Sequence, residues 1–201
     1  KVLGIGHNTP EDPGDREILG NSLASLQYGF TFAIDYMGFD ASVFFQGTGD
    51  HYWYPAGMNM SFWGPYAYSY ASFIPRDFYT TMCWSEDNPD AYFPRPRAYS
   101  STGGQLRLIN DRYLQNIRYL RLKNLTLGYT IPKKVTKVLS LEKVRVYFSG
   151  ENLHYWSPLT KVTNYLDPEA SFQRNDTNSS ARNQMYYPWQ KTYMFGIDIT
   201  F

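Results

Sequence analysis

Residues 193–201 of this chain alternate large apolar side chains with small or polar ones. In an extended strand the odd-numbered members share one face: Tyr193, Phe195, Ile197, Ile199 and Phe201. In a water-soluble domain another element would have to cover so many large apolar groups. In a transmembrane β-barrel lipid covers that face, and the neighbouring strands satisfy the backbone hydrogen bonds. The pattern therefore favours a membrane-spanning strand.

The same period of two recurs in four earlier segments, so we expect strands near 24–36, 41–49, 117–131, 143–153 and 190–201. The apolar positions of the third segment change parity between Leu122 and Leu125. This change indicates either a β-bulge or a stretch that extends beyond the bilayer. No run of 18 apolar residues is present, so transmembrane helices are not expected.

The connections between the expected strands alternate between short and long. In outer-membrane barrels short turns face the periplasm and long loops face outward. This assigns 37–40 and 132–142 to the periplasmic side, and 50–116 and 154–189 to the extracellular side. Five strands cannot close a barrel, because bacterial single-chain barrels have at least eight. We therefore expect an all-β fragment that supplies the C-terminal strands of a larger antiparallel barrel, and a start without Met or signal peptide fits that view.

Composition narrows the class of function. The formal net charge is +1, which gives no electrostatic basis for nucleic-acid binding. Aromatic residues make up 18% of the chain, as expected for a barrel with aromatic girdles. Cys83 is the only cysteine, so no disulfide forms within the chain, and no metal-ligand or catalytic spacing is visible. We expect no cofactor, no metal site and no enzyme activity.

The long segment 50–116 is rich in aromatic residues and supplies the candidate substrate-binding side chains. Flat rings can pack against the C–H faces of sugars at low entropic cost. The alternative is that the rings pack the loop on itself or against a partner protein. The candidates are Trp53, Tyr54, Trp63, Tyr66, Tyr68 and Trp84.

Charged and polar residues suggest weaker sites. Asp12, Asp15 and Glu17 could hold Ca²⁺, although a solvated acidic loop explains them as well. The histidines lie far apart and fit exposed loops: His7, His51 and His154. Polar side chains on the lumen side of the strands could line a substrate path or contact a plug: Gln27, Asp35, Arg145, Glu151 and Asp198.

Several motifs resemble one family. Segment 119–132, YLRLKNLTLGYTIP, is similar to a segment near the C-terminus of SusC/RagA-type TonB-dependent transporters of Bacteroidetes, and 144–153, VRVYFSGENL, resembles the strand that follows it. Further matching pieces occur in the expected order: 36–40 (YMGFD), 44–47 (FFQG), 84–95 (WSEDNPDAYFPR), 167–169 (DPE) and 187–188 (YP). The resemblance covers about residues 18–201.

The resemblance implies a barrel of about 22 strands with an N-terminal plug domain that this chain does not contain. It implies TonB-dependent import of oligosaccharides through the bacterial outer membrane, with a SusD-like surface lipoprotein as a lid and TonB acting on the missing N-terminal part. A dimer of transporter–lipoprotein pairs is compatible with it. The alternatives are import of oligopeptides, or a surface binding or adhesion protein anchored by its barrel. A soluble β-sandwich is the structural alternative.

Overall fold

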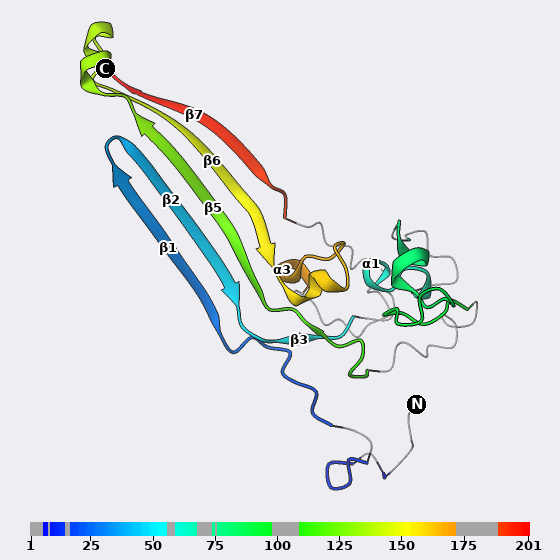
Figure 1. Cartoon of the computed structure of the whole chain (residues 1–201). Helices are drawn as coiled ribbons and strands as arrows, with labels where there is room; N and C mark the ends of the chain where they lie inside the picture. Colours follow the sequence, from blue (N-terminus) through cyan, green and yellow to red (C-terminus); the bar gives the residue numbers. More distant parts are fainter. Residues whose placement is uncertain are drawn as a thin grey trace.

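The computed structural model describes residues 6–7, 9–14, 17–55, 59–67, 74, 76–97, 109–171 and 189–201. Its main feature is a five-stranded antiparallel sheet with the strand order β1-β2-β5-β6-β7 (Figure 1). These strands are β1 (Gln27–Tyr36), β2 (Phe39–Thr48), β5 (Tyr119–Thr130), β6 (Lys143–Trp156) and β7 (Thr192–Thr200). Two short strands, β3 (Tyr52–Trp53) and β4 (Gln115–Asn116), pair separately.

Each expected strand segment contains one strand of this sheet, but some ends differ. The first turn is two residues long rather than the expected 37–40, because Met37 and Gly38 both have positive φ and form a tight hairpin. Phe39 therefore already pairs with Tyr36. β6 continues past the expected end at 153 to Trp156, because its pairing with β5 resumes there.

One face of the sheet is apolar across all five strands. The register aligns Ile34, Ala41, Leu127, Phe148 and Phe195 in one row. The outer members of this row are open to the surroundings: Ile34 is 66% exposed and Phe195 is 83% exposed. All five odd-numbered apolar residues of 193–201 are exposed as well. Within the described residues, these five side chains are therefore not buried against another element.

The opposite face is polar. Ser42, Thr126 and Ser149 lie in one row, and the Thr126 and Ser149 hydroxyls are 3.4 Å apart. Met194 ends this row, and Phe44 is a second large apolar exception. Its ring lies beside Gly29, where a Cβ atom would come within 3.2 Å of the ring. The missing side chain at Gly29 leaves room for this ring.

A β-bulge at Lys123 explains the change of parity in β5. Asn124 pairs with Phe44 while Leu122 pairs with Phe45, so Lys123 is the extra residue. On β6 the irregularity includes Asn152, which has a φ of 50°. The bulge keeps the apolar face continuous through Leu122 and turns charged residues of β5 toward the polar face.

The two ends of the sheet differ. One end has only the β1–β2 turn and a small helical connection, α2 (Lys133–Thr136) with η4 (Lys137–Leu139). Figure 1 shows the long connections gathered at the other end. They contain α1 (Met60–Trp63), η1 (Gly64–Tyr66), η2 (Phe78–Met82), η5 (Pro158–Lys161) and α3 (Pro168–Ser171).

The buried core lies within these connections, which we call the loop assembly (residues 51–117 and 157–171, as far as described), and not beneath the sheet. Among the described residues, no helix has both the length and the apolar character needed to cross a bilayer.

Candidate functional site

The centre of the loop assembly is a cluster of aromatic rings. Phe93 is fully buried, and its ring centroid lies 5.8 to 6.1 Å from those of Trp63, Tyr66 and Phe78. Leu159 and Leu166, which come from the β6–β7 connection, belong to the same core. The two long connections therefore fold into one body, held together mainly by aromatic packing.

This core contains half of the predicted substrate-binding residues. Trp53, Trp63 and Tyr66 are 6%, 1% and 4% exposed, so their rings pack the loop assembly on itself. That is the alternative considered from the sequence, and its physical reason is that aromatic rings gain more by burying area than by facing water. Tyr68 lies outside the described residues.

Tyr54 and Trp84 remain partly exposed. The Tyr54 hydroxyl accepts a hydrogen bond from Asn110 Nδ2 at 3.1 Å, and burial raises the pKa of Tyr54 to about 12. Burial also raises the pKa values of Tyr66, Tyr92 and Tyr113. The Arg95 guanidinium lies 6.0 Å from the centre of the Trp84 ring. Of the described candidates, these two can still reach a ligand without unfolding the core.

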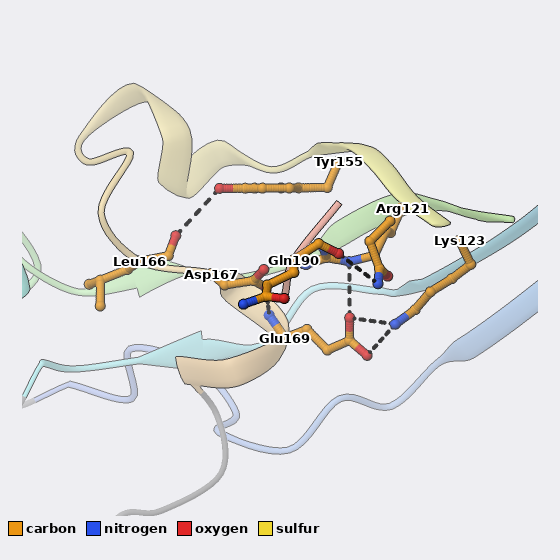
Figure 2. A network of polar contacts seen from close by, with 8 residues as sticks. Arg121, Lys123, Tyr155, Leu166, Asp167, Glu169 and Gln190 are labelled. Atoms are coloured by element: carbon orange, nitrogen blue, oxygen red, sulfur yellow. Dashed lines mark hydrogen bonds and ion pairs between the residues drawn. The ribbon is translucent and has the colours of Figure 1, made fainter. Parts of the chain in front are cut away.

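A buried charge network joins the loop assembly to the polar face of the sheet (Figure 2). The Arg121 side chain is 1% exposed, and its Nη2 donates to Oδ1 of Asp167, which is 2% exposed. Arg121 Nε lies 3.0 Å from Glu169 Oε2. Lys123 Nζ donates to both Glu169 oxygens at 2.9 and 3.0 Å. Two strand cations thus meet two carboxylates from the loop that precedes β7.

The local structure at each partner explains this geometry. Asp167 accepts the backbone N–H of Glu169 at 2.9 Å, and this turn at the start of α3 directs both carboxylates toward β5. On the strand side, the bulge brings Lys123 within reach of the same loop.

Aromatic rings complete the surroundings of the two cations. The Arg121 guanidinium is 4.9 Å from the centre of the Tyr155 ring, and Lys123 Nζ is 4.8 Å from that of Trp189. The Tyr155 hydroxyl donates to the Leu166 carbonyl at 3.5 Å. We call the set Arg121, Lys123, Tyr155, Asp167, Glu169 and Trp189 the loop anchor. It links Asp167, Glu169 and Trp189 of the β6–β7 connection to β5.

A second charge network lies toward the other end of the polar face. Arg145 donates through Nε to Asp40 Oδ1 at 2.9 Å and through Nη1 to Asp198 Oδ2 at 3.1 Å. The Asp40 carboxylate and the Arg145 guanidinium lie over Gly128, where a Cβ atom would come within 2.4 Å of the carboxylate. The network links β2, β6 and β7 on the polar face, as expected for Arg145 and Asp198.

The remaining sequence candidates do not form a site in the described residues. Asp12 is engaged by His7, whose ring Nδ1 lies 2.7 Å from Oδ2, and this hydrogen bond holds the pKa of Asp12 below its usual value. Asp15 lies outside the described residues. No cluster of three or more His, Cys, Asp or Glu side chains suited to a metal ion occurs in the described ranges.

The loop anchor was not predicted from the sequence. Its charged residues lie in the segments 119–132 and 167–169, and each ion-paired cation and carboxylate are about 46 positions apart, a separation at which spacing alone carries little pairing information. The available signal was two charged residues flanking Leu122 inside an otherwise uncharged strand, together with a DPE turn in the connection after the next strand.

The chain is similar to known proteins in sequence and in fold. No protein-family model matches the chain. It is similar to TonB-dependent receptor P3 of Formosa agariphila, 31% identical over 194 residues, which cover 93% of this chain and 17% of the relative. TonB-dependent receptor P26 of the same organism is 29% identical over 191 residues, covering 93% of this chain and 18% of the relative. The chain thus spans less than a fifth of the length of these relatives.

Solved structures give the same picture at the level of fold. A structure of the RagAB peptide transporter matches 86% of this chain and 17% of its own, with 20% identity and a TM-score of 0.55. The RagAB peptide importer in its closed-closed state matches 92% of this chain and 18% of its own, with 20% identity and a TM-score of 0.59. The antiparallel sheet with its long loops therefore has the fold of part of such a transporter.

Proposed function

Because the chain is homologous to TonB-dependent receptors over 93% of its length, we propose that it forms part of the wall of an outer-membrane barrel that imports nutrients. The two-faced sheet is the observation that carries this proposal. One face exposes apolar side chains over strands of 9 to 14 residues, and the other bears hydroxyls, amides and ion pairs. Strands of about 9–11 residues, tilted, cross a bilayer.

We place the polar face on the inside of the barrel, where it lines a passage or contacts a plug domain. Buried ion pairs such as Arg121–Asp167 are costly in lipid unless protein surrounds them, so this face belongs away from the membrane. The loop assembly then lies outside the cell. In this arrangement the loop anchor holds one external loop against the inner wall, where it borders the path of an incoming molecule.

We propose the partners from the family resemblance. A SusD-like lipoprotein closes over the loop assembly, and TonB acts on a plug domain that is not in this chain. Of the predicted candidates that the structure describes, the partly exposed Tyr54 and Trp84 are available for the lid or for cargo.

For the cargo, we propose an oligosaccharide. The cations of the loop anchor and Arg145 are engaged by carboxylates, so the described polar face offers mainly neutral hydrogen-bonding groups, such as Gln46, Thr126 and Ser149. Oligopeptides are the second candidate, because the RagAB structures with this fold are of a peptide transporter.

An uptake experiment with the full-length protein tests both the proposed import and the proposed cargo. Cells that express it with its lipoprotein should accumulate a labelled oligosaccharide, and a protonophore that collapses the proton-motive force should abolish the uptake. Uptake of labelled peptides instead would replace the cargo proposal. Surface binding without uptake, insensitive to the protonophore, would contradict import and favour a barrel-anchored adhesion protein.

A variant pair tests the aromatic candidates. Trp84→Ala should weaken cargo or lid binding while the loop assembly keeps its resistance to protease. Trp63→Ala should weaken binding only together with loss of that resistance, because Trp63 is a core residue. Unchanged binding in Trp84→Ala would remove Trp84 from the candidate site.

A further inference from the structure

A groove of about 790 Å³ lies at the loop end of the apolar face. Its floor contains Tyr28, Leu120 and Trp156, which belong to the last cross-strand row of that face, and Gly47 completes the row. Because Gly47 has no side chain, the Tyr28 ring can lie across β2 and donate its hydroxyl to the Tyr119 carbonyl at 3.2 Å. The floor is therefore a continuation of the exposed apolar surface.

Aromatic side chains mark the boundary of that surface. Trp156 is 50% exposed, and the His154 ring packs edge-on against it with centroids 4.6 Å apart. Trp and Tyr gather at the level of lipid head groups, because one end of each ring system is apolar and the other is polar. Tyr28 and Trp156 occupy that level here.

The rim of the groove is cationic. Arg118, Lys161 and Lys191 line it, and all three are exposed. Arg118 Nη1 pairs with Asp50 Oδ1 at 3.1 Å, and the Arg118 side chain stays 54% exposed. Neither Lys161 nor Lys191 forms an ion pair with a described carboxylate. Asn164 adds a neutral amide to the rim.

From this juxtaposition we infer that the groove binds the phosphorylated head group of a membrane glycolipid, with an acyl chain along Leu120 and Trp156. The inference rests on the proposed function, since it requires the apolar face to lie in the outer membrane. Lysine and arginine side chains attract phosphate, and an apolar floor suits the attached hydrocarbon. A free phosphate ion would use the rim but gain nothing from the floor. The continuity of the floor with the lipid-facing surface therefore favours a lipid.

The site is tested by lipid binding to the full-length protein in detergent, followed by native mass spectrometry. The probes are phosphorylated lipid A, lipid A from which phosphate has been removed, and inorganic phosphate as a competitor. The double variant Lys161→Gln/Lys191→Gln removes the two lysines at the rim of the groove. The matched control is Lys133→Gln/Lys134→Gln, which removes two exposed lysines at the opposite end of the sheet.

We expect phosphorylated lipid A to bind at least about tenfold more tightly than the dephosphorylated form, since each lysine near such a head group adds roughly a factor of five. The Lys161/Lys191 variant should lose this preference and the Lys133/Lys134 variant should keep it. Equal binding of both lipids, equal loss in both variants, or full displacement by inorganic phosphate would overturn the inference. The lipid comparison in the unmodified protein decides the matter even if a variant fails to fold. If uptake were absent while the preference for phosphorylated lipid A remained, the result would count against the proposed import and not against the lipid site.

Discussion

The sheet and the loop assembly use the same residue types in opposite environments. Phe195 in β7 is 83% exposed, whereas Phe93 in the loop assembly is fully buried among other rings. Burial also increases along the polar face of the sheet toward the loop assembly: Arg121 is 1% exposed at the loop end, and Arg145 is 21% exposed further along. The loops therefore carry their own core, while no described element covers the apolar face of the sheet, which we propose to lie against lipid. Substitutions in the two regions should accordingly have different consequences.

The largest effect is expected at the loop anchor. Arg121→Ala should destabilise the loop assembly by about 3–5 kcal/mol, because it removes the buried guanidinium that neutralises the Asp167 and Glu169 carboxylates. Hydrogen exchange of residues 157–171 in the full-length protein measures this loss. The control is Arg118→Ala, which breaks an exposed pair with Asp50 and should cost at most about 1 kcal/mol. Similar protection in both variants would mean that the loop is held by other contacts.

The next effect belongs to the sheet. Ile197→Arg should destabilise the barrel by about 2–4 kcal/mol if this position lies near the midplane of the bilayer. Assembly should be followed by the resistance of the folded protein to heat in detergent. Asp198→Asn changes the neighbouring residue on the polar face and should leave assembly nearly intact. Unchanged heat resistance in Ile197→Arg would remove this position from the lipid-facing surface.

A smaller effect is expected from the second charge network. Asp40→Asn should cost about 1 kcal/mol or less, since the Asp40 and Arg145 side chains are 25% and 21% exposed and Asp198 remains to pair with Arg145. Denaturant unfolding of the refolded full-length protein measures it. A loss as large as that of Arg121→Ala would show that the two networks are equally buried in the complete barrel.

The smallest effect concerns pH. Burial raises the pKa of Tyr54 from its ordinary value of 10.0 to about 12, so folding favours the neutral phenol. The resulting stability is fully present below about pH 10 and is lost as pH rises toward 12. Protease resistance of the loop assembly should therefore fall in that window, before the sheet is affected. Loss of protease resistance already between pH 7 and 9 would contradict ionisation of Tyr54 as its cause.

Much of the sheet could be predicted from the sequence, because a period of two specifies both strand and face. The parity change between Leu122 and Leu125 predicted the bulge at Lys123 as one of two explanations. The two-residue turn at Met37 and Gly38 moved the start of the second strand to Phe39, because the apolar pattern does not mark where a turn ends. The loop assembly was harder. Trp53, Trp63 and Tyr66 were proposed to bind substrate, but an aromatic loop rich in proline has no periodicity that separates a buried ring from an exposed one.

The central claim, that lipid covers the apolar face, is tested most directly along β7. Single spin labels at each position from 193 to 200, in a Cys83→Ala background of the full-length protein in lipid vesicles, report collision with dissolved oxygen, which concentrates in the bilayer. The account predicts high oxygen accessibility at Tyr193, Phe195, Ile197 and Ile199 and low accessibility at the positions between them. Uniform accessibility, or high values at the even-numbered positions, would contradict it.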